Sequence, residues 1–220
     1  ISYLCKVGNT FFNFKKFSIN QQNCAMKVCT DSCLFGAWIS IPENTKNILD
    51  IGTGTGLLSL MLSQRFLATV DAVEIDKTTA NQAFDNIQNS PWKNNINVIN
   101  ADIKNFITPK KYNLIICNPP FYENEFLSKN IKEKTAKHAI TLNLAELLQN
   151  IHKHLHPNGA FAILLPYKRK DEFNQLAETY GYFPYKTLTV QQTPLHQQFR
   201  YMAMFSTQKH LQQTMETIAI

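Results

Sequence analysis

Short runs of apolar residues alternate along this chain with longer stretches in which apolar positions recur three or four residues apart. The first pattern predicts buried strands and the second predicts amphipathic helices. Strands are expected at residues 47–51, 70–75, 96–100, 112–117, 160–165, 183–190 and 199–206. Helices are expected at residues 57–65, 77–89, 142–154 and 171–180. This alternation predicts an α/β fold with a doubly wound, seven-stranded and mostly parallel sheet.

The first 45 residues precede the alternation and have a different pattern. Apolar and polar positions alternate over residues 10–17 and 24–28, which predicts a small hairpin. A length of 220 residues suits one sizeable domain and is too short for two ordinary ones. We therefore expect a single domain over 1–220, in which a hairpin and helix extension at 1–45 packs on a core at 46–207.

The charge balance narrows the class of partner. The 22 lysine and arginine residues exceed the 16 aspartate and glutamate residues, which leaves a net charge of +6. This favours an anionic partner, because neutralising phosphates releases their counterions. No apolar run approaches the roughly 20 residues that span a bilayer, so no membrane partner is expected.

The cysteines and histidines give no strong sign of a metal. Five cysteines without an evident secretory segment favour reduced thiols and a cytoplasmic location. Cys24, Cys29 and Cys33 form no Cys-x-x-Cys pair and lack an obvious fourth ligand, so we expect them to fill the core. His152 and His156 share a helix face, but histidines near a helix C-terminus are explained by its dipole. We predict no metal site.

The stretch from Asp50 to Gly56 reads Asp-Ile-Gly-Thr-Gly-Thr-Gly and lies between a predicted strand and a predicted helix. Gly52 and Gly54 allow a tight turn and a close approach of backbone to ligand. The helix that begins near Gly56 directs its free N–H groups at that ligand. The spacing differs from the Gly-x-Gly-x-x-Gly of dinucleotide folds. The preceding acid, Asp50, suits a charged amino group such as the methionine end of S-adenosyl-L-methionine.

Two further acids follow the next strands. Glu74, at the end of the second strand, could accept hydrogen bonds from both hydroxyls of a ribose. Asp102, after the third strand, could meet the amino group of an adenine. Either acid alone could equally be a solvated loop residue. Three acids at successive strand ends beside one glycine turn predict S-adenosyl-L-methionine as the cofactor.

The sequence Asn-Pro-Pro-Phe directly follows the predicted strand at 112–117. An exocyclic amine on a base is a poor nucleophile, because its lone pair is delocalised into the ring. Two acceptors can bind its hydrogens and turn the lone pair towards a methyl donor, and prolines keep such a turn rigid. An aromatic ring offers a surface on which a flipped base can stack. We predict methyl transfer to an amino group, with four catalytic residues: Asn118, Pro119, Pro120 and Phe121.

The glycine turn and the Asn-Pro-Pro-Phe turn together resemble the class I, Rossmann-like methyltransferases that modify amino groups. Further blocks extend the resemblance over nearly the whole chain, at residues 12–17, 24–31, 36–38, 89–92 and 118–122. With these blocks the chain resembles the bacterial tRNA1(Val) (adenine-37-N6)-methyltransferase family. The resemblance implies methyl transfer from S-adenosyl-L-methionine to the exocyclic N6 of an adenine in tRNA, at position 37 beside the anticodon of a valine tRNA.

The resemblance also implies roles for residues outside the two turns. Residues 27–31 would fold beside the glycine turn, with Thr30 and Asp31 near the methionine moiety, and Asn118 would also meet the cofactor. Residues 14–17 would lie near the mouth of the site. Arg200 precedes the last strand and could reach a phosphate. The expected contacts to tRNA are Lys15, Phe17, Lys27, Tyr122 and Arg200.

Other functions use a similar turn. Phenylalanine at the place of residue 121 also occurs in RNA guanine-N2 methyltransferases. Protein glutamine N5 methyltransferases also use an Asn-Pro-Pro turn, because the lone pair of an amide nitrogen is delocalised in the same way. A DNA methyltransferase and a cofactor-binding module without catalysis are further alternatives. Four lysines after the turn either contact tRNA phosphates or lie on a solvated loop: Lys129, Lys132, Lys134 and Lys137. We expect the enzyme to be a monomer.

Overall fold

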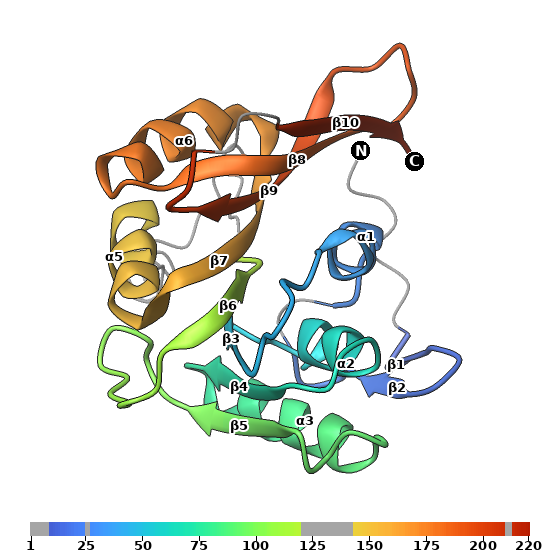
Figure 1. Ribbon diagram of the computed structural model, residues 1–220. Coiled ribbons are helices and arrows are strands. Elements are labelled where there is room, and N and C mark those ends of the chain that lie inside the picture. The colour runs from blue at the N-terminus through green and yellow to red at the C-terminus, as the bar shows by residue number, and fades with distance from the viewer. Residues whose placement is uncertain (1–8, 25–26, 120–142, 210–212) are drawn as a thin grey trace, which may run out of the picture.

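The computed structural model describes residues 9–24, 27–119, 143–209 and 213–220 (Figure 1). Its main sheet has the strand order β10-β8-β9-β7-β6-β3-β4-β5. The strands are β3 (Asn47–Ile51), β4 (Thr69–Glu74), β5 (Ile96–Asn100), β6 (Tyr112–Cys117), β7 (Leu155–Pro166), β8 (Phe183–Gln191), β9 (Gln198–Ser206) and β10 (Thr214–Ala219). Only β9 runs antiparallel to its neighbours, so the sheet is mostly parallel, as predicted.

Helices cover both faces of this sheet. They are α1 (Thr30–Trp38), α2 (Leu57–Ser63), α3 (Lys77–Gln88), α5 (Leu144–His154) and α6 (Lys170–Thr179), with a short 3-10 turn at Tyr167–Arg169. Buried side chains of α1, α2 and α3 form one hydrophobic cluster with the sheet, and those of α5 and α6 form another. Figure 1 shows α5 and α6 together beside β7, away from α1, α2 and α3. The doubly wound prediction is therefore confirmed.

All seven predicted strands form, but the sheet has an eighth strand. β10 pairs in parallel with β8 at the edge of the sheet. Its side chains are mostly exposed, so its sequence shows no apolar run from which a strand could be predicted. This strand is formed by backbone hydrogen bonding to β8, which is a separate segment of the chain.

The N-terminal hairpin is shorter than predicted. Its strands are β1 (Phe11–Asn13) and β2 (Ser18–Asn20), paired antiparallel. The turn between them is closed by the N–H of Phe14, which donates to the carbonyl of Phe17 at 2.8 Å, and by stacking of their rings at 4.5 Å. The described residues of the second predicted segment, 24, 27 and 28, lie outside strands. Local turn contacts therefore pair 11–13 with 18–20 instead.

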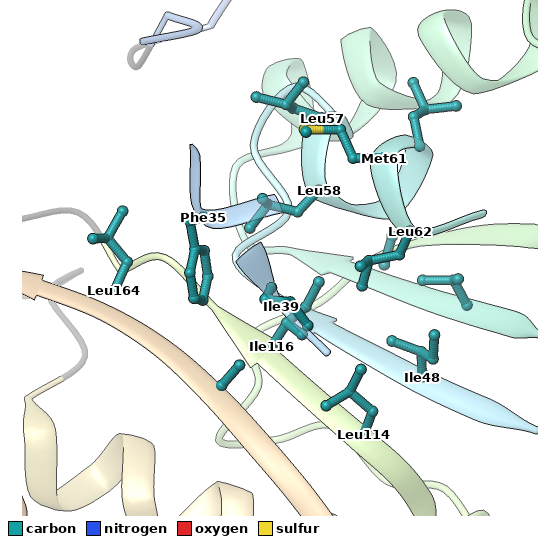
Figure 2. Packing of buried hydrophobic residues seen from close by; sticks show 14 of the residues in the cluster. Phe35, Ile39, Ile48, Leu57, Leu58, Met61, Leu62, Leu114, Ile116 and Leu164 are labelled. Carbon is teal, nitrogen blue, oxygen red and sulfur yellow. The ribbon is translucent and has the colours of Figure 1, made fainter. Parts of the chain in front are cut away.

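The hairpin and α1 pack on the rest of the structure. Asn86 of α3, which is 1% exposed, accepts from the N–H of Asn20 and donates to its carbonyl. Figure 2 shows Phe35 of α1 and Ile39, which directly follows this helix, lying beside Leu58 and Ile116 within one buried cluster. This packing is consistent with one domain, and the division into 1–45 and 46–207 stays a prediction.

Candidate active site

The two sequence turns meet at one edge of the sheet. β3 and β6 are parallel neighbours, and Ile51 is paired with Cys117. The next residues, Gly52 and Asn118, therefore leave the sheet side by side at the carboxyl ends of their strands. The chain proceeds from β3 towards β5 on one side and from β6 towards β7 on the other. Ligands of doubly wound sheets bind at such a reversal of strand order.

The glycine turn adopts the backbone conformation that the sequence suggests. Gly52, Gly54 and Gly56 have φ angles of 70°, 58° and 83°, in the left-handed region that other residues rarely adopt. A Cβ placed on Gly52 or Gly54 would meet nothing within 4 Å. The turn thus presents open backbone at these two positions, with room for a ligand to approach. A Cβ on Gly56 would instead lie 3.3 Å from Ile87 of α3.

Asp50 lies completely buried at the end of β3. Its Oδ2 accepts hydrogen bonds from the hydroxyls of Thr53 and Ser59, both at 2.7 Å. Its Oδ1 is buried without a partner among the described residues. Burial raises the pKa of this carboxyl to about 6, and the two hydroxyls partly oppose the shift. An unpartnered carboxylate oxygen beside the open glycine turn fits a ligand with a charged amino group.

Glu74 ends β4 and supports the glycine turn. One carboxylate oxygen accepts the N–H of Gly54 at 3.0 Å, and the other accepts the N–H of Asp76 at 3.0 Å. Burial raises the pKa of Glu74 above its usual value, while these backbone donors oppose the shift. Each oxygen retains a second lone pair, so Glu74 can still accept from the hydroxyls of a ribose.

Asp102 lies at the same sheet edge but further from the glycine turn. It follows β5, which is separated from β3 by β4. Its Oδ1 accepts the N–H of Lys104 at 2.9 Å, and its Oδ2 is 4.0 Å from the ammonium of the same lysine. The side chain is 25% exposed and remains accessible to a ligand.

Asn118 contacts helix α1 across the edge of the sheet. Its side-chain nitrogen donates to the hydroxyl of Ser32 at 3.2 Å. Pro119 is buried directly after it. Three of the predicted site residues, Pro120, Phe121 and Tyr122, lie outside the described residues, as do the four lysines at 129–137.

Thr30 and Asp31 form the first turn of α1, close to Asn118 through their neighbour Ser32. Asp31 accepts a hydrogen bond from Nε of Arg200 at 2.7 Å, and this ion pair is mostly shielded from solvent. The structure therefore joins a residue predicted for the cofactor to one predicted for tRNA. Arg200 also donates to the carbonyl of Phe199 and lies over the ring of that residue.

The predicted N-terminal contacts to tRNA differ in accessibility. Lys15 is exposed in the hairpin turn, and Lys27 is half-buried ahead of α1. Phe17 is only 5% exposed, with its ring stacked on Phe14 and edge-on to Trp92 at 5.9 Å. A ring so enclosed has no open face for a base. We therefore assign Phe17 to the packing of the hairpin.

Several site residues escaped prediction from the sequence. Ser32 supports Asn118, and Thr53 and Ser59 bind Asp50. The role of Ser59 could have been predicted, because it is a polar residue inside a helix whose other residues are mostly apolar and buried. The sequence gives no indication of the role of Ser32, since its hydrogen-bond partner Asn118 is 86 residues away.

Within the described ranges, no three histidine, cysteine or acidic side chains gather where they could hold a metal ion. The ring of His152 is hydrogen-bonded to Tyr182 at 3.0 Å, and that of His156 accepts the N–H of Asn158 at 3.2 Å. No helix in the same part of the chain has both the length and the apolar character needed to cross a membrane.

Comparison with known proteins agrees with this geometry. Residues 32–184 match the family described as the methyltransferase small domain. Among solved structures, a methyltransferase from Pyrococcus furiosus resembles the chain with a TM-score of 0.57 at 22% identity, covering 80% of this chain and 81% of that one. The glycopeptide N-methyltransferase MtfA, solved with S-adenosyl-L-methionine, has a TM-score of 0.59 at 9% identity, covering 81% and 93%. These two structures share the fold.

Sequence relatives are closer. A tRNA1(Val) (adenine(37)-N6)-methyltransferase from Dyadobacter fermentans is 44% identical over 191 residues, which cover 86% of this chain and 78% of the relative. A protein of the same name from Flavobacterium psychrophilum is 39% identical over 201 residues, which cover 90% and 86%. The chain belongs to the methyltransferase small domain family and to the tRNA1(Val) (adenine(37)-N6)-methyltransferase family.

Proposed function

We propose that this protein transfers a methyl group from S-adenosyl-L-methionine to the exocyclic N6 of adenine 37 in a valine tRNA. This is the activity in the names of its sequence relatives. The observation that carries the proposal is the pairing of Ile51 with Cys117. This pairing brings Gly52 and Asn118 out of the sheet next to each other. It supports a site in which a methyl group would pass between ligands bound at the two turns.

The residues of the first turn fit the cofactor. The open backbone at Gly52 and Gly54 would lie against it, Glu74 would bind its ribose hydroxyls, and the unpartnered oxygen of Asp50 would attract its amino group. Thr30, Asp31, Gly56, Asp102 and Asn118 are the remaining proposed contacts. When bound, the cofactor supplies a methyl group already activated by a positively charged sulfur.

The second turn would hold the target base. The Asn118 side-chain oxygen and the Pro119 carbonyl would accept hydrogen bonds from the two hydrogens of the adenine amino group. Accepting both hydrogens draws the nitrogen towards tetrahedral geometry and directs its lone pair at the methyl group. No strong base is required, because the proton can leave to water after transfer. Phe121 would stack on the flipped adenine.

The exposed Lys15 and the half-buried Lys27 would contact tRNA phosphates. We propose the same role for Lys129, Lys132, Lys134 and Lys137, which lie outside the described residues. We further propose that the enzyme works as a monomer in the cytoplasm, where tRNA is modified. Light scattering of the purified protein, alone and with tRNA, measures the number of protein copies in each complex.

The identity of the product tests the function. Purified protein is incubated with isotopically labelled S-adenosyl-L-methionine and total tRNA lacking modifications, and the nucleosides are identified by mass spectrometry. We expect labelled N6-methyladenosine, recovered in a valine isoacceptor at position 37. Labelled N2-methylguanosine would assign the enzyme to the guanine alternative, and label in glutamine of a protein fraction would assign it to protein methylation.

A further inference from the structure

Asn118 is anchored by one end of its amide. Its Nδ2 donates to the hydroxyl of Ser32 at 3.2 Å. Asn118 directly follows β6, and Ser32 lies in the first turn of α1. Ser32 is 7% exposed, so water competes little for this hydrogen bond. The contact joins the proposed catalytic turn to a helix that lies far from it in the sequence.

The orientation of this amide decides whether the site can work. The amino group of a base offers hydrogens, so the site must face it with oxygen atoms. The oxygen and nitrogen of an asparagine amide are nearly equal in size and exchange places when the group turns by about 180°. In the wrong orientation Asn118 would direct its own N–H groups at the amine. Binding the nitrogen to Ser32 leaves the oxygen for the target.

A serine hydroxyl can donate as well as accept, so a further group must direct its proton. The sulfur of Cys29 lies 3.0 Å from the Ser32 oxygen. When the Ser32 proton is directed at this sulfur, the lone pairs of the hydroxyl remain to accept from Asn118. Cys29, Ser32 and Asn118 then form a chain of hydrogen bonds with one direction.

The anchor itself is held firmly. Near the end of α1, the guanidinium of Arg65 donates to the carbonyls of Gly36 and Ile39 at 2.7 and 2.8 Å. At its start, Asp31 is paired with Arg200 of β9. The helix therefore cannot shift easily when a base enters.

We propose that Ser32 is a positioning residue, which holds the amide of Asn118 with its oxygen towards the target amine. This rests on the proposed function. Loss of the Ser32 hydroxyl would leave the amide free to sample both orientations, which would slow transfer more than it weakens the binding of either ligand.

The test compares Ser32→Ala with Ser63→Ala. Ser63 is also a buried helical serine, and its hydroxyl has no partner among the described residues. We expect Ser32→Ala to lower kcat about threefold to tenfold, which corresponds to one lost hydrogen bond. KM for tRNA and the Kd of S-adenosyl-L-methionine should stay within about twofold of wild type. Ser63→Ala should leave all three constants unchanged, and Ser32→Thr, which keeps the hydroxyl, should recover most of the rate.

A second readout needs no activity. In the cofactor-free protein, the side-chain NH2 signal of Asn118, identified by its loss in Asn118→Asp, should exchange with solvent faster in Ser32→Ala than in Ser63→Ala. Equal kcat and equal exchange in these two variants would overturn the proposal, as would a parallel loss of cofactor affinity and thermal stability in Ser32→Ala. A wild-type protein that makes no N6-methyladenosine would instead refute the proposed function.

Discussion

Asn118 is the side chain whose loss should affect methyl transfer most directly, because no aliphatic group can replace its amide oxygen. We expect Asn118→Ala to lower kcat by about 100-fold or more, the usual cost of removing one aligned polar group from a reacting centre. The Kd of S-adenosyl-L-methionine, measured by calorimetry, should change less than about threefold. A variant that retains more than a tenth of the wild-type rate would contradict the proposed role of this residue.

Glu74 should affect binding instead of chemistry. Its carboxylate supports the N–H of Gly54 and is proposed to bind the cofactor ribose. We expect Glu74→Ala to weaken cofactor binding about 10-fold to 100-fold, because hydrogen bonds to a charged group are lost and two backbone donors, of Gly54 and Asp76, lose their acceptor. Asp85→Ala is the matched control, since it removes the same charge from an exposed position of α3. Equal Kd values for the two variants would exclude the role of Glu74.

His154 should make stability depend on pH. It is 2% exposed, and its Nε2 has no partner among the described residues. Burial, with smaller effects of Lys153 and Lys111, lowers its pKa to about 4. As the pH falls below about 6.5, His154 therefore binds a proton in the unfolded chain while it stays neutral in the folded protein. Stability contributed by the neutral ring is complete above about pH 6.5 and is lost as the pH falls towards 4.

Replacing this histidine tests the argument. His154→Phe keeps an aromatic ring beside Phe106 and Tyr112 but cannot be protonated. Between pH 7 and pH 4.5, we expect the free energy of unfolding to fall about 2–3 kcal/mol less in the variant than in wild type. Urea denaturation at a series of pH values measures the difference. Parallel pH profiles for the two proteins would mean that His154 does not titrate in this range.

Among the elements, α1 packs closely against α2 at Gly36. A Cβ on Gly36 would lie 2.6 Å from the sulfur of Met61 and 3.2 Å from Leu58, both on α2. We expect Gly36→Ala to lower the free energy of unfolding by about 1–3 kcal/mol, since α1 or Met61 must move. Transfer should slow as well, because α1 carries Ser32. Thermal melts and single-turnover rates measure both effects.

The control for this variant is Ala37→Ser, at an exposed position of the same helix. Such a surface change should alter stability by less than about 0.5 kcal/mol. If Gly36→Ala were as stable and as active as the control, Met61 would accommodate the methyl group without displacing the helix.

For the molecule as a whole, β10 separates stability from activity. It lies at the edge of the sheet, and three strands stand between it and β6. Deleting residues 208–220 should remove backbone pairing with β8 and cost about 1–2 kcal/mol, which lowers the melting temperature by about 2–8 °C. The transfer rate at 20 °C should stay within about twofold of wild type. A folded but inactive truncated protein would show that the edge strand reaches the site.

Periodicity in the sequence was enough to predict the α/β class and the seven strands from β3 to β9. The family was predicted from the resemblance of the two turns and the further sequence blocks, and the comparisons confirm it. Local patterns record these features because a buried strand needs a continuous apolar run and a glycine turn needs residues that accept positive φ. The hairpin was predicted only in part and β10 not at all. Their pairing depends on backbone contacts, which leave little trace in an exposed sequence.

Contacts between distant residues lay beyond the sequence pattern. Asn118 meets Ser32 across 86 positions, and Asp31 pairs with Arg200 across 169. From the sequence, Asp31 and Arg200 were predicted to contact different ligands, whereas in the folded protein they form an ion pair. Such pairs arise because parallel strands and helices bring remote segments to one edge of the sheet. Residue spacing along the chain does not specify which side chains then come within hydrogen-bonding distance, since that depends on how the whole core packs.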